Sequence, residues 1–197
     1  MFYYKKTITN EKIANLPVEY FNGEIAIVST VEGLIEAKKS LTKEKIVGFD
    51  TETRPSFVKG DIHNVALMQI ATLDKCYLFR LNILRNLDEY PSAMTDLSQL
   101  DNVVKVGLSL RDDIANLQRK FKFNPVNFVD LQSVVKNFGI EEQSLKKIYA
   151  IIFKKKISKK QQTSNWERYE LSPKQQQYAA LDAWACLQIY NKLFGTK

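Results

Sequence analysis

The order of short apolar runs is the feature of this sequence that most restricts its fold. The runs expected to form strands of one sheet are residues 46–49, 65–71, 76–79, 103–106 and 127–129. The first three follow one another with turn residues between them, and the short connection 72–75 predicts an antiparallel hairpin for the second and third. Helical patterns then alternate with strands. This order predicts an α/β fold: a mixed five-stranded sheet, with three antiparallel strands plus parallel strands, flanked by helices.

Outside these runs, residues 25–28 predict a further short strand, and Ser29 with Glu32 forms an S-x-x-E capping box that would open the next helix. The apolar side of that helix is expected to carry Val31, Leu34, Ile35 and Leu41. Other helices are predicted at residues 81–88, 92–100 and 111–122, and through most of the chain after the last strand. No repeat or Pro/Gly/Ser-rich linker interrupts the sequence, so residues 1–197 are expected to form one domain, with residues 1–24 as an extended arm.

The residue counts exclude several kinds of site. The chain has one histidine, His63, which is most simply a surface residue, and two cysteines, Cys76 and Cys186, too few for a zinc cluster or a disulfide framework. Its glycines form neither a dinucleotide-binding fingerprint nor a phosphate loop. No apolar run approaches the ~18 residues of a membrane span, and the N-terminus lacks the apolar core of a signal peptide. We therefore expect a cytoplasmic protein that does not enter a membrane.

Positive charge is concentrated in one segment. Lys and Arg number 29 against 22 Asp and Glu, a net charge of +7, and residues 146–160 hold seven lysines and no acidic residue. Such a patch attracts phosphate groups, although a solvated helix end would have the same composition. Tyr149 and Phe153 lie among these lysines, where they either stack on nucleic-acid bases or anchor the segment to the core.

Two acidic residues, Asp50 and Glu52, directly follow the strand at 46–49. Because residues two apart on a strand point to the same side, both carboxylates would share one face of the sheet. Like charges so close repel each other and raise a pKa unless a cation lies between them. The alternative is a polar strand exit with both groups in water.

The last helix carries an acidic residue on its apolar face. Ser172 is the expected N-cap of this helix, Pro173 lies in its first turn, and Gln175 completes a capping box. The stripe that should face the core consists of Tyr178, Leu181, Asp182, Ala185 and Ile189. A carboxylate is rarely buried unless it is paired or binds a metal ion, and Tyr178 lies one turn before Asp182 on the same side. The alternative is an Asp at the helix edge bonded to a lysine or a backbone N–H.

A third acidic pair, Asp112 and Asp113, opens the helix at 111–122, where carboxylates are favoured by the helix dipole alone. Helix phase places Asp113 toward the core and Asp112 toward solvent. Asp130 is interpreted as the N-cap of the following helix. Four carboxylates from three distant segments can therefore converge beside one tyrosine, and oxygen ligands of this kind suit Mg²⁺ or Mn²⁺.

These residues carry a family resemblance. The matching segments are FDTET (49–53), VALMQIA (65–71), VGLSLRDDIANL (106–117), SLKKI (144–148) and SNWERYELSPKQQQYAALDA (164–183), with YAALDAWACLQIY (178–190) as the third motif. From about residue 25 to its end the chain resembles the DEDD 3′–5′ exonucleases of the DnaQ-like superfamily, which have the ribonuclease H fold. It is most similar to the tyrosine subgroup, that is, to the ribonuclease D group and the exonuclease domain of the Werner syndrome helicase.

The resemblance implies roles for individual residues. Asp50, Glu52 and Asp182 would bind one Mg²⁺ or Mn²⁺ ion, Asp50 and Asp113 would hold a second, and Tyr178 would orient the attacking water. The residues expected to contact nucleic acid are Thr51, Leu67, Gln69, Lys154, Lys155, Lys156 and Trp166. Leu67 and Gln69 would line the pocket of the terminal nucleotide. The cluster Lys154–Lys160, which includes the three lysines just named, would bind upstream phosphates.

The implied activity is metal-dependent 3′–5′ hydrolysis of DNA or RNA that releases nucleoside 5′-monophosphates by a two-metal mechanism. The expected partners are DNA or RNA 3′ ends and no membrane. Two alternatives remain open: a non-catalytic nucleic-acid-binding module that retains the fold, and a ribonuclease D-like enzyme that trims RNA. Since the chain ends soon after Asp182 and has no helicase motif, we expect a stand-alone exonuclease domain.

Overall fold

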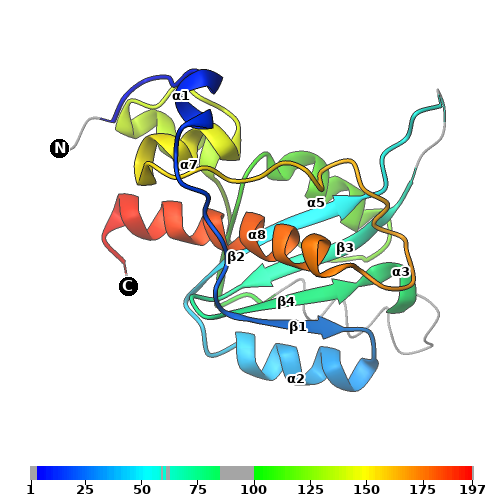
Figure 1. Cartoon of the computed structure of the whole chain (residues 1–197). Coiled ribbons are helices and arrows are strands. Elements are labelled where there is room, and N and C mark those ends of the chain that lie inside the picture. The colour runs from blue at the N-terminus through cyan, green and yellow to red at the C-terminus, as the bar shows by residue number, and fades with distance from the viewer. Residues whose placement is uncertain (1–3, 59, 61–62, 85–99, 197) are drawn as a thin grey trace.

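The computed structural model describes residues 4–58, 60, 63–84 and 100–196. Its sheet has six strands in the order β1-β4-β3-β2-β5-β6. Figure 1 shows β1, β4 and β3 side by side. The strands are β1 (Glu24–Val28), β2 (Ile46–Thr53), β3 (Val65–Ala71), β4 (Lys75–Arg80), β5 (Val104–Gly107) and β6 (Phe128–Asp130). β3 pairs antiparallel with β2 and β4, and the other three pairings are parallel. The predicted mixed α/β fold and its hairpin are confirmed, but the strand count is six because β1 pairs with β4.

Helices cover both faces of the sheet. The helices of the described residues are α1 (Asn10–Ala14), α2 (Val31–Leu41), α3 (Leu81–Leu84), α5 (Leu110–Gln118), α6 (Leu131–Val134), η1 (Val135–Phe138), α7 (Leu145–Phe153) and α8 (Pro173–Phe194). The apolar residues of α7 and α8 form one core cluster with one face of the sheet, and those of α2 and α5 form a second cluster with the other. In the described part of the chain, no helix combines the length and the apolar character needed to cross a bilayer.

Several predicted helix limits needed correction. α2 is capped by Thr30, whose side chain accepts a hydrogen bond from the Gly33 N–H, and not by Ser29. Its Ile35 is 60% exposed, so the apolar side is narrower than expected. The helix predicted to reach residue 122 ends at Gln118. Of the helices predicted at 81–88 and 92–100, the structure describes Leu81–Leu84 as helical, and residues 85–99 lie outside the described residues.

The last helix, α8, begins as predicted. Ser172 caps it, and Gln175 completes the capping box. All five residues of the predicted stripe are buried, Asp182 with 2% of its surface exposed. α8 lies so close to β2 that a Cβ on Gly48 would stand 1.9 Å from the carbonyl oxygen of Ala183. Glycine at position 48 therefore lets the backbone that carries Asp182 approach the strand that carries Asp50.

The N-terminal arm is not extended throughout, because it contains α1 and then pairs with the segment after α7. The Glu19 N–H donates to the Lys156 carbonyl at 2.9 Å, and the Lys156 N–H donates to the Pro17 carbonyl at 2.8 Å. Tyr149 is 1% exposed and donates to the Glu19 carboxylate at 2.9 Å. Its ring stacks on Phe153 with centroids 4.5 Å apart. Of the two interpretations of this aromatic pair, the structure supports the anchor to the core.

Candidate active site

Three carboxylates meet where β2 and α8 come together. Asp50, Glu52 and Asp182 each offer an oxygen, and these atoms lie within 4.8 Å of one another. Asp50 and Glu52 share a face because they are two apart on β2, and the close contact at Gly48 brings Asp182 onto that face. Asp182 Oδ1 is buried without a hydrogen-bond partner. Three carboxylate donors and an unpartnered oxygen fit a divalent cation that prefers oxygen ligands.

Asp113 is not one of these three carboxylates and does not line their cavity, although its charge acts on Asp50. Its carboxylate accepts a hydrogen bond from the Thr51 hydroxyl, which ties the first turn of α5 to β2. Asp112, one residue earlier, is exposed, in agreement with the helix-phase prediction. The predicted N-cap role of Asp130 is confirmed, since its carboxylate accepts from the Gln132 N–H at 2.9 Å. The same carboxylate accepts from the Ser109 N–H at 3.1 Å and so also fixes the start of α5.

A lysine that the sequence did not single out enters the cluster. Lys159 Nζ donates to Asp182 Oδ2 at 2.8 Å and to the Tyr178 hydroxyl at 3.4 Å. Asp182 is thus buried, as the metal-ligand interpretation predicted, and also bonded to a lysine, as the alternative interpretation predicted. The sequence feature that could have pointed to Lys159 is the lysine-rich segment 146–160. Spacing along the chain does not show which of its lysines turns toward the carboxylates.

The pKa values of the carboxyl groups in this region are raised, mainly because burial removes these groups from water. Burial, with a further contribution from Asp50, raises the pKa of Glu52 to about 10. Burial and then the charges of Asp182 and Asp113 raise the pKa of Asp50 well above its usual range. Burial raises the pKa of Asp113 to about 6, against the hydrogen bond from Thr51. Without a metal ion the cluster therefore retains protons at neutral pH, and a divalent cation would replace them.

Tyr178 keeps its proton. Burial, followed by the charges of Asp182 and Glu52, raises the pKa of its phenol. A neutral phenol at this position can donate a hydrogen bond but cannot act as a base at neutral pH. Its ring lies 5.9 Å from that of Trp166, tilted by 37°.

Three residues that were predicted to contact nucleic acid lie in the interior of the structure. Leu67, Gln69 and Trp166 are each 0% exposed, so none has surface to offer a nucleotide. Leu67 and Gln69 pair with Glu52 and Asp50 across β2 and β3, but α8 covers that part of β3. The match to the family motif placed them near the acidic residues without showing what covers them. Thr51, by contrast, lines the cavity of the carboxylate cluster.

The three predicted phosphate-binding lysines face the N-terminal arm and helix α7. Lys155 forms an ion pair with Glu19 at 2.9 Å, and Lys156 Nζ donates to the Ala14 carbonyl at 2.5 Å. Lys154 donates to the carbonyl of Ile151 in its own helix. The lysines of this segment that line the cavity of the carboxylate cluster are Lys146 and Lys159, and not these three.

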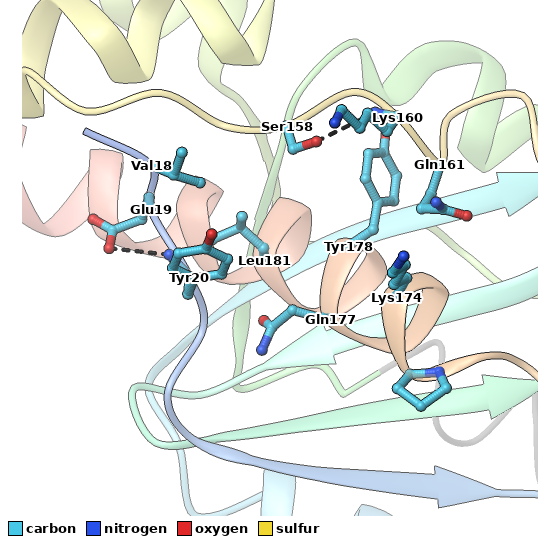
Figure 2. Close-up of a pocket in the computed structure, with 11 residues that line it drawn as sticks. Val18, Glu19, Tyr20, Ser158, Lys160, Gln161, Lys174, Gln177, Tyr178 and Leu181 are labelled. Carbon is cyan, nitrogen blue, oxygen red and sulfur yellow. Dashed lines mark hydrogen bonds between the residues drawn. The ribbon is translucent and has the colours of Figure 1, made fainter. Parts of the chain in front are cut away.

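Two cavities meet at Tyr178. The first, here called the acidic pocket, has a volume of ≈ 410 Å³. It is lined by Asp50, Thr51, Glu52, Leu108, Ser109, Gln143, Ser144, Leu145, Lys146, Lys159, Gln162, Tyr178, Asp182 and Cys186. The second, here called the side pocket, has a volume of ≈ 400 Å³. It is lined by Val18, Glu19, Tyr20, Ser158, Lys160, Gln161, Pro173, Lys174, Gln177, Tyr178 and Leu181 (Figure 2).

Residues 25–195 match the family model described as 3′-5′ exonuclease. The chain belongs to the 3′–5′ exonuclease domain family. This match covers all six strands except the first residue of β1, and every residue of the carboxylate cluster. It confirms the resemblance inferred from the sequence motifs.

Curated relatives of this exonuclease domain are longer proteins. It is 31% identical to the mouse bifunctional 3′-5′ exonuclease/ATP-dependent helicase WRN, over 91% of this chain and 13% of that protein. It is also 31% identical to exonuclease 3′-5′ domain-containing protein 2 of Drosophila melanogaster, over 81% of this chain and 27% of that protein. The chain therefore spans between about an eighth and a quarter of the length of these two relatives.

Solved structures agree with the fold of the exonuclease domain. The EXO domain of Nibbler from Aedes aegypti matches with a TM-score of 0.80 at 25% identity, over 91% of this chain and 92% of that one. Ribonuclease D of Trypanosoma brucei, solved in complex with the RNA U12, matches with a TM-score of 0.77 at 21% identity, over 90% of this chain and 64% of that one. The similarity to the Trypanosoma brucei ribonuclease D, at 21% identity, is evidence about the fold alone.

Proposed function

We propose that this exonuclease domain hydrolyses the terminal phosphodiester bond at the 3′ end of DNA or RNA and releases nucleoside 5′-monophosphates. The observation that carries the proposal is the convergence of Asp50, Glu52 and Asp182 within 4.8 Å at the floor of an open pocket. Burying three carboxylates together is costly unless cations neutralise them. A fold that retains such a cluster beside a neutral tyrosine is well suited to metal-assisted hydrolysis.

Each residue has a distinct part in this proposal. Asp50, Glu52 and Asp182 would hold one Mg²⁺ or Mn²⁺ ion, and Asp50 with Asp113 would hold a second. Two such ions, when bound, supply an acidified water and stabilise the charge that develops on the phosphate and on the leaving oxygen. The Thr51 hydroxyl holds the Asp113 carboxylate toward β2. Tyr178, whose phenol stays protonated, would orient the attacking water by a hydrogen bond.

The choice between DNA and RNA stays open in this proposal. The relatives' names mention exonuclease activity, and one structural neighbour was solved with RNA. Recognition of a 2′-hydroxyl depends on contacts within the acidic pocket, whose lining includes the polar residues Ser109, Gln143 and Gln162. Digestion of matched single-stranded DNA, duplex DNA with a recessed 3′ end, and RNA in parallel would assign the substrate.

The test is digestion of 5′-labelled oligonucleotides with Mg²⁺ or Mn²⁺. The wild-type chain should give a ladder that shortens from the 3′ end, and Asp50→Asn or Asp182→Asn should abolish it. Asp112→Asn is the matched control, because this neighbouring carboxylate is exposed, and it should leave the ladder nearly unchanged. A wild-type protein that binds strands without shortening them would instead support the non-catalytic alternative.

A further inference from the structure

The side pocket on the far side of Tyr178 has no part in the reaction proposed above. Figure 2 shows that its walls come from three segments: the N-terminal arm at Val18–Tyr20, the coil at 158–161, and the first turns of α8. Most of the lining surface is apolar, from side chains such as Val18, Leu181 and the Tyr178 ring. At ≈ 400 Å³ it is large enough for a small aromatic group.

An exposed aromatic residue stands at this pocket. Tyr20 is 55% exposed and Val18 is 40% exposed, although both belong to an arm that is otherwise tied down by hydrogen bonds to Lys156. A tyrosine held on a fixed backbone with its ring accessible is a surface on which a flat apolar group can stack. Proteins that bind single strands use exposed aromatic rings of this kind as platforms for bases.

The charge around the pocket is positive. Lys160 and Lys174 both line it, and both are exposed. The one carboxylate in the lining, Glu19, is paired with Lys155 and accepts hydrogen bonds from Tyr149 and from the Tyr20 N–H, so its charge is satisfied elsewhere. In Figure 2 the Glu19 side chain points away from the other lining residues. Apolar walls with two ammonium groups complement a base flanked by phosphates.

The side pocket adjoins the acidic pocket, because Tyr178 stands between them. Tyr178 lines both pockets, and the consecutive residues Lys159 and Lys160 line the acidic pocket and the side pocket respectively. The ≈ 410 Å³ of the acidic pocket accommodates one nucleotide with its phosphate at the carboxylates. A strand that leaves this pocket past Tyr178 reaches the side pocket with its next nucleotide.

We propose that the side pocket binds the base of the second nucleotide from the 3′ end, stacked on Tyr20, with neighbouring phosphates on Lys160 and Lys174. This inference rests on the proposed function, because it takes the 3′-terminal nucleotide to occupy the acidic pocket. It assigns the ligand as single-stranded nucleic acid with at least two nucleotides.

The test measures binding without turnover. A fluorescent decamer binds to the wild-type chain in Ca²⁺, and unlabelled competitors displace it: a nucleoside 5′-monophosphate, a 5′-phosphorylated dinucleotide and an octamer, each in deoxy and ribo form. Tyr20→Ala should weaken the dinucleotide and the octamer about tenfold, the effect of losing one base stack, and leave the mononucleotide unchanged. Tyr20→Trp should restore binding. The ribo and deoxy series show which nucleic acid is preferred.

Matched variants separate the pocket from general surface effects. Tyr169→Ala removes an 83% exposed tyrosine that lines neither pocket and should change nothing. Lys174→Gln should reduce the salt dependence of octamer binding by about one phosphate contact. If Tyr20→Ala leaves octamer binding unchanged, or weakens the mononucleotide equally, the assignment of this pocket is wrong.

The two proposals fail in different ways. A wild-type chain that binds the octamer through Tyr20 but never shortens it would contradict the catalytic proposal and leave the nucleotide site standing. A chain that shortens strands with the same preference for length in the wild type and in Tyr20→Ala would contradict the side-pocket assignment alone.

Discussion

At the scale of single residues, the positive charge of Lys159 partly balances the negative charge of the buried carboxylates. Burial lowers the pKa of Lys159, but the charges of Asp182, Asp50 and Glu52 outweigh this and raise it, so the ammonium group stays charged. Its distance of 2.8 Å from Asp182 Oδ2 puts a positive charge among groups that would also bind a metal ion. Lys159 therefore stabilises the carboxylate cluster and would compete with a bound metal ion for Asp182.

Replacing this lysine should change metal affinity and stability in opposite directions. In Lys159→Met, we expect metal-free protein to lose about 2 kcal/mol of stability, since a buried carboxylate loses a hydrogen-bond donor. The dissociation constant for Mn²⁺ should fall several-fold because a competing cation is gone. Electron paramagnetic resonance of free Mn²⁺ and thermal melting in chelator measure the two effects. Lys160→Met, one residue along and exposed, is the control. An unchanged Mn²⁺ affinity would contradict the competition.

The raised carboxyl pKa values predict how stability depends on pH. Glu52 titrates near 4.5 when exposed to water and at about 10 in the fold, so between these values the folded state binds more protons than the unfolded state. The free energy of unfolding of metal-free protein must then fall as pH rises through this window, by up to about 1.4 kcal/mol per pH unit for one proton. Urea unfolding at pH 5.5, 7.0 and 8.5 in chelator measures the slope. Glu52→Gln should flatten it, and a rise in stability over this range would refute the prediction.

At the scale of elements, the contact between β2 and α8 determines the site. A Cβ on Gly48 would lie 1.9 Å from the Ala183 carbonyl oxygen, which is backbone and cannot rotate away. The helix would have to shift, and Asp182 would move with it. The position of the Asp182 carboxylate thus depends on the absence of a Cβ at Gly48, two residues before Asp50.

Gly48→Ala should therefore destabilise the protein by about 1–3 kcal/mol and weaken Mn²⁺ binding, although no ligand is altered. Gly33→Ala is the control, since its added Cβ would meet neighbours at 3.3 Å and 3.4 Å and alanine favours a helix interior. This control should be neutral or slightly stabilising. Denaturant unfolding and a Mn²⁺ titration measure both variants, and normal Mn²⁺ affinity in Gly48→Ala would show that α8 tolerates the shift.

The same contact explains what sequence could predict. The meeting of Asp50, Glu52 and Asp182 follows from two local periodicities, one on a strand and one on a helix, together with the motif match. Local patterns could not show that α8 covers Leu67 and Gln69, because a strand buried on both faces looks the same whichever element covers it. The pairing of Lys159 with Asp182 joins a coil to a helix, and no spacing along the chain encodes it.

At the scale of the whole molecule, the buried carboxylate cluster destabilises the fold, and a bound metal ion would remove this destabilisation. We expect Mn²⁺ at a hundred times its dissociation constant to stabilise the domain by about 2.7 kcal/mol, provided that it binds the folded state alone. Thermal melting with and without Mn²⁺ measures this gain. Asp182→Asn should lose most of it, whereas Asp112→Asn should keep it. Equal gains in both variants would place the ion outside the cluster.

The position of α8 in the chain has a consequence for synthesis. All six described strands precede Pro173, so the strands are synthesised before α8, the helix that carries Asp182. At ~5–20 residues per second, ribosomes add the 22 residues of α8 in roughly one to four seconds. During that interval a nascent chain has the strand that carries Asp50 and Glu52 but not Asp182, so the three carboxylates can meet only after α8 has docked.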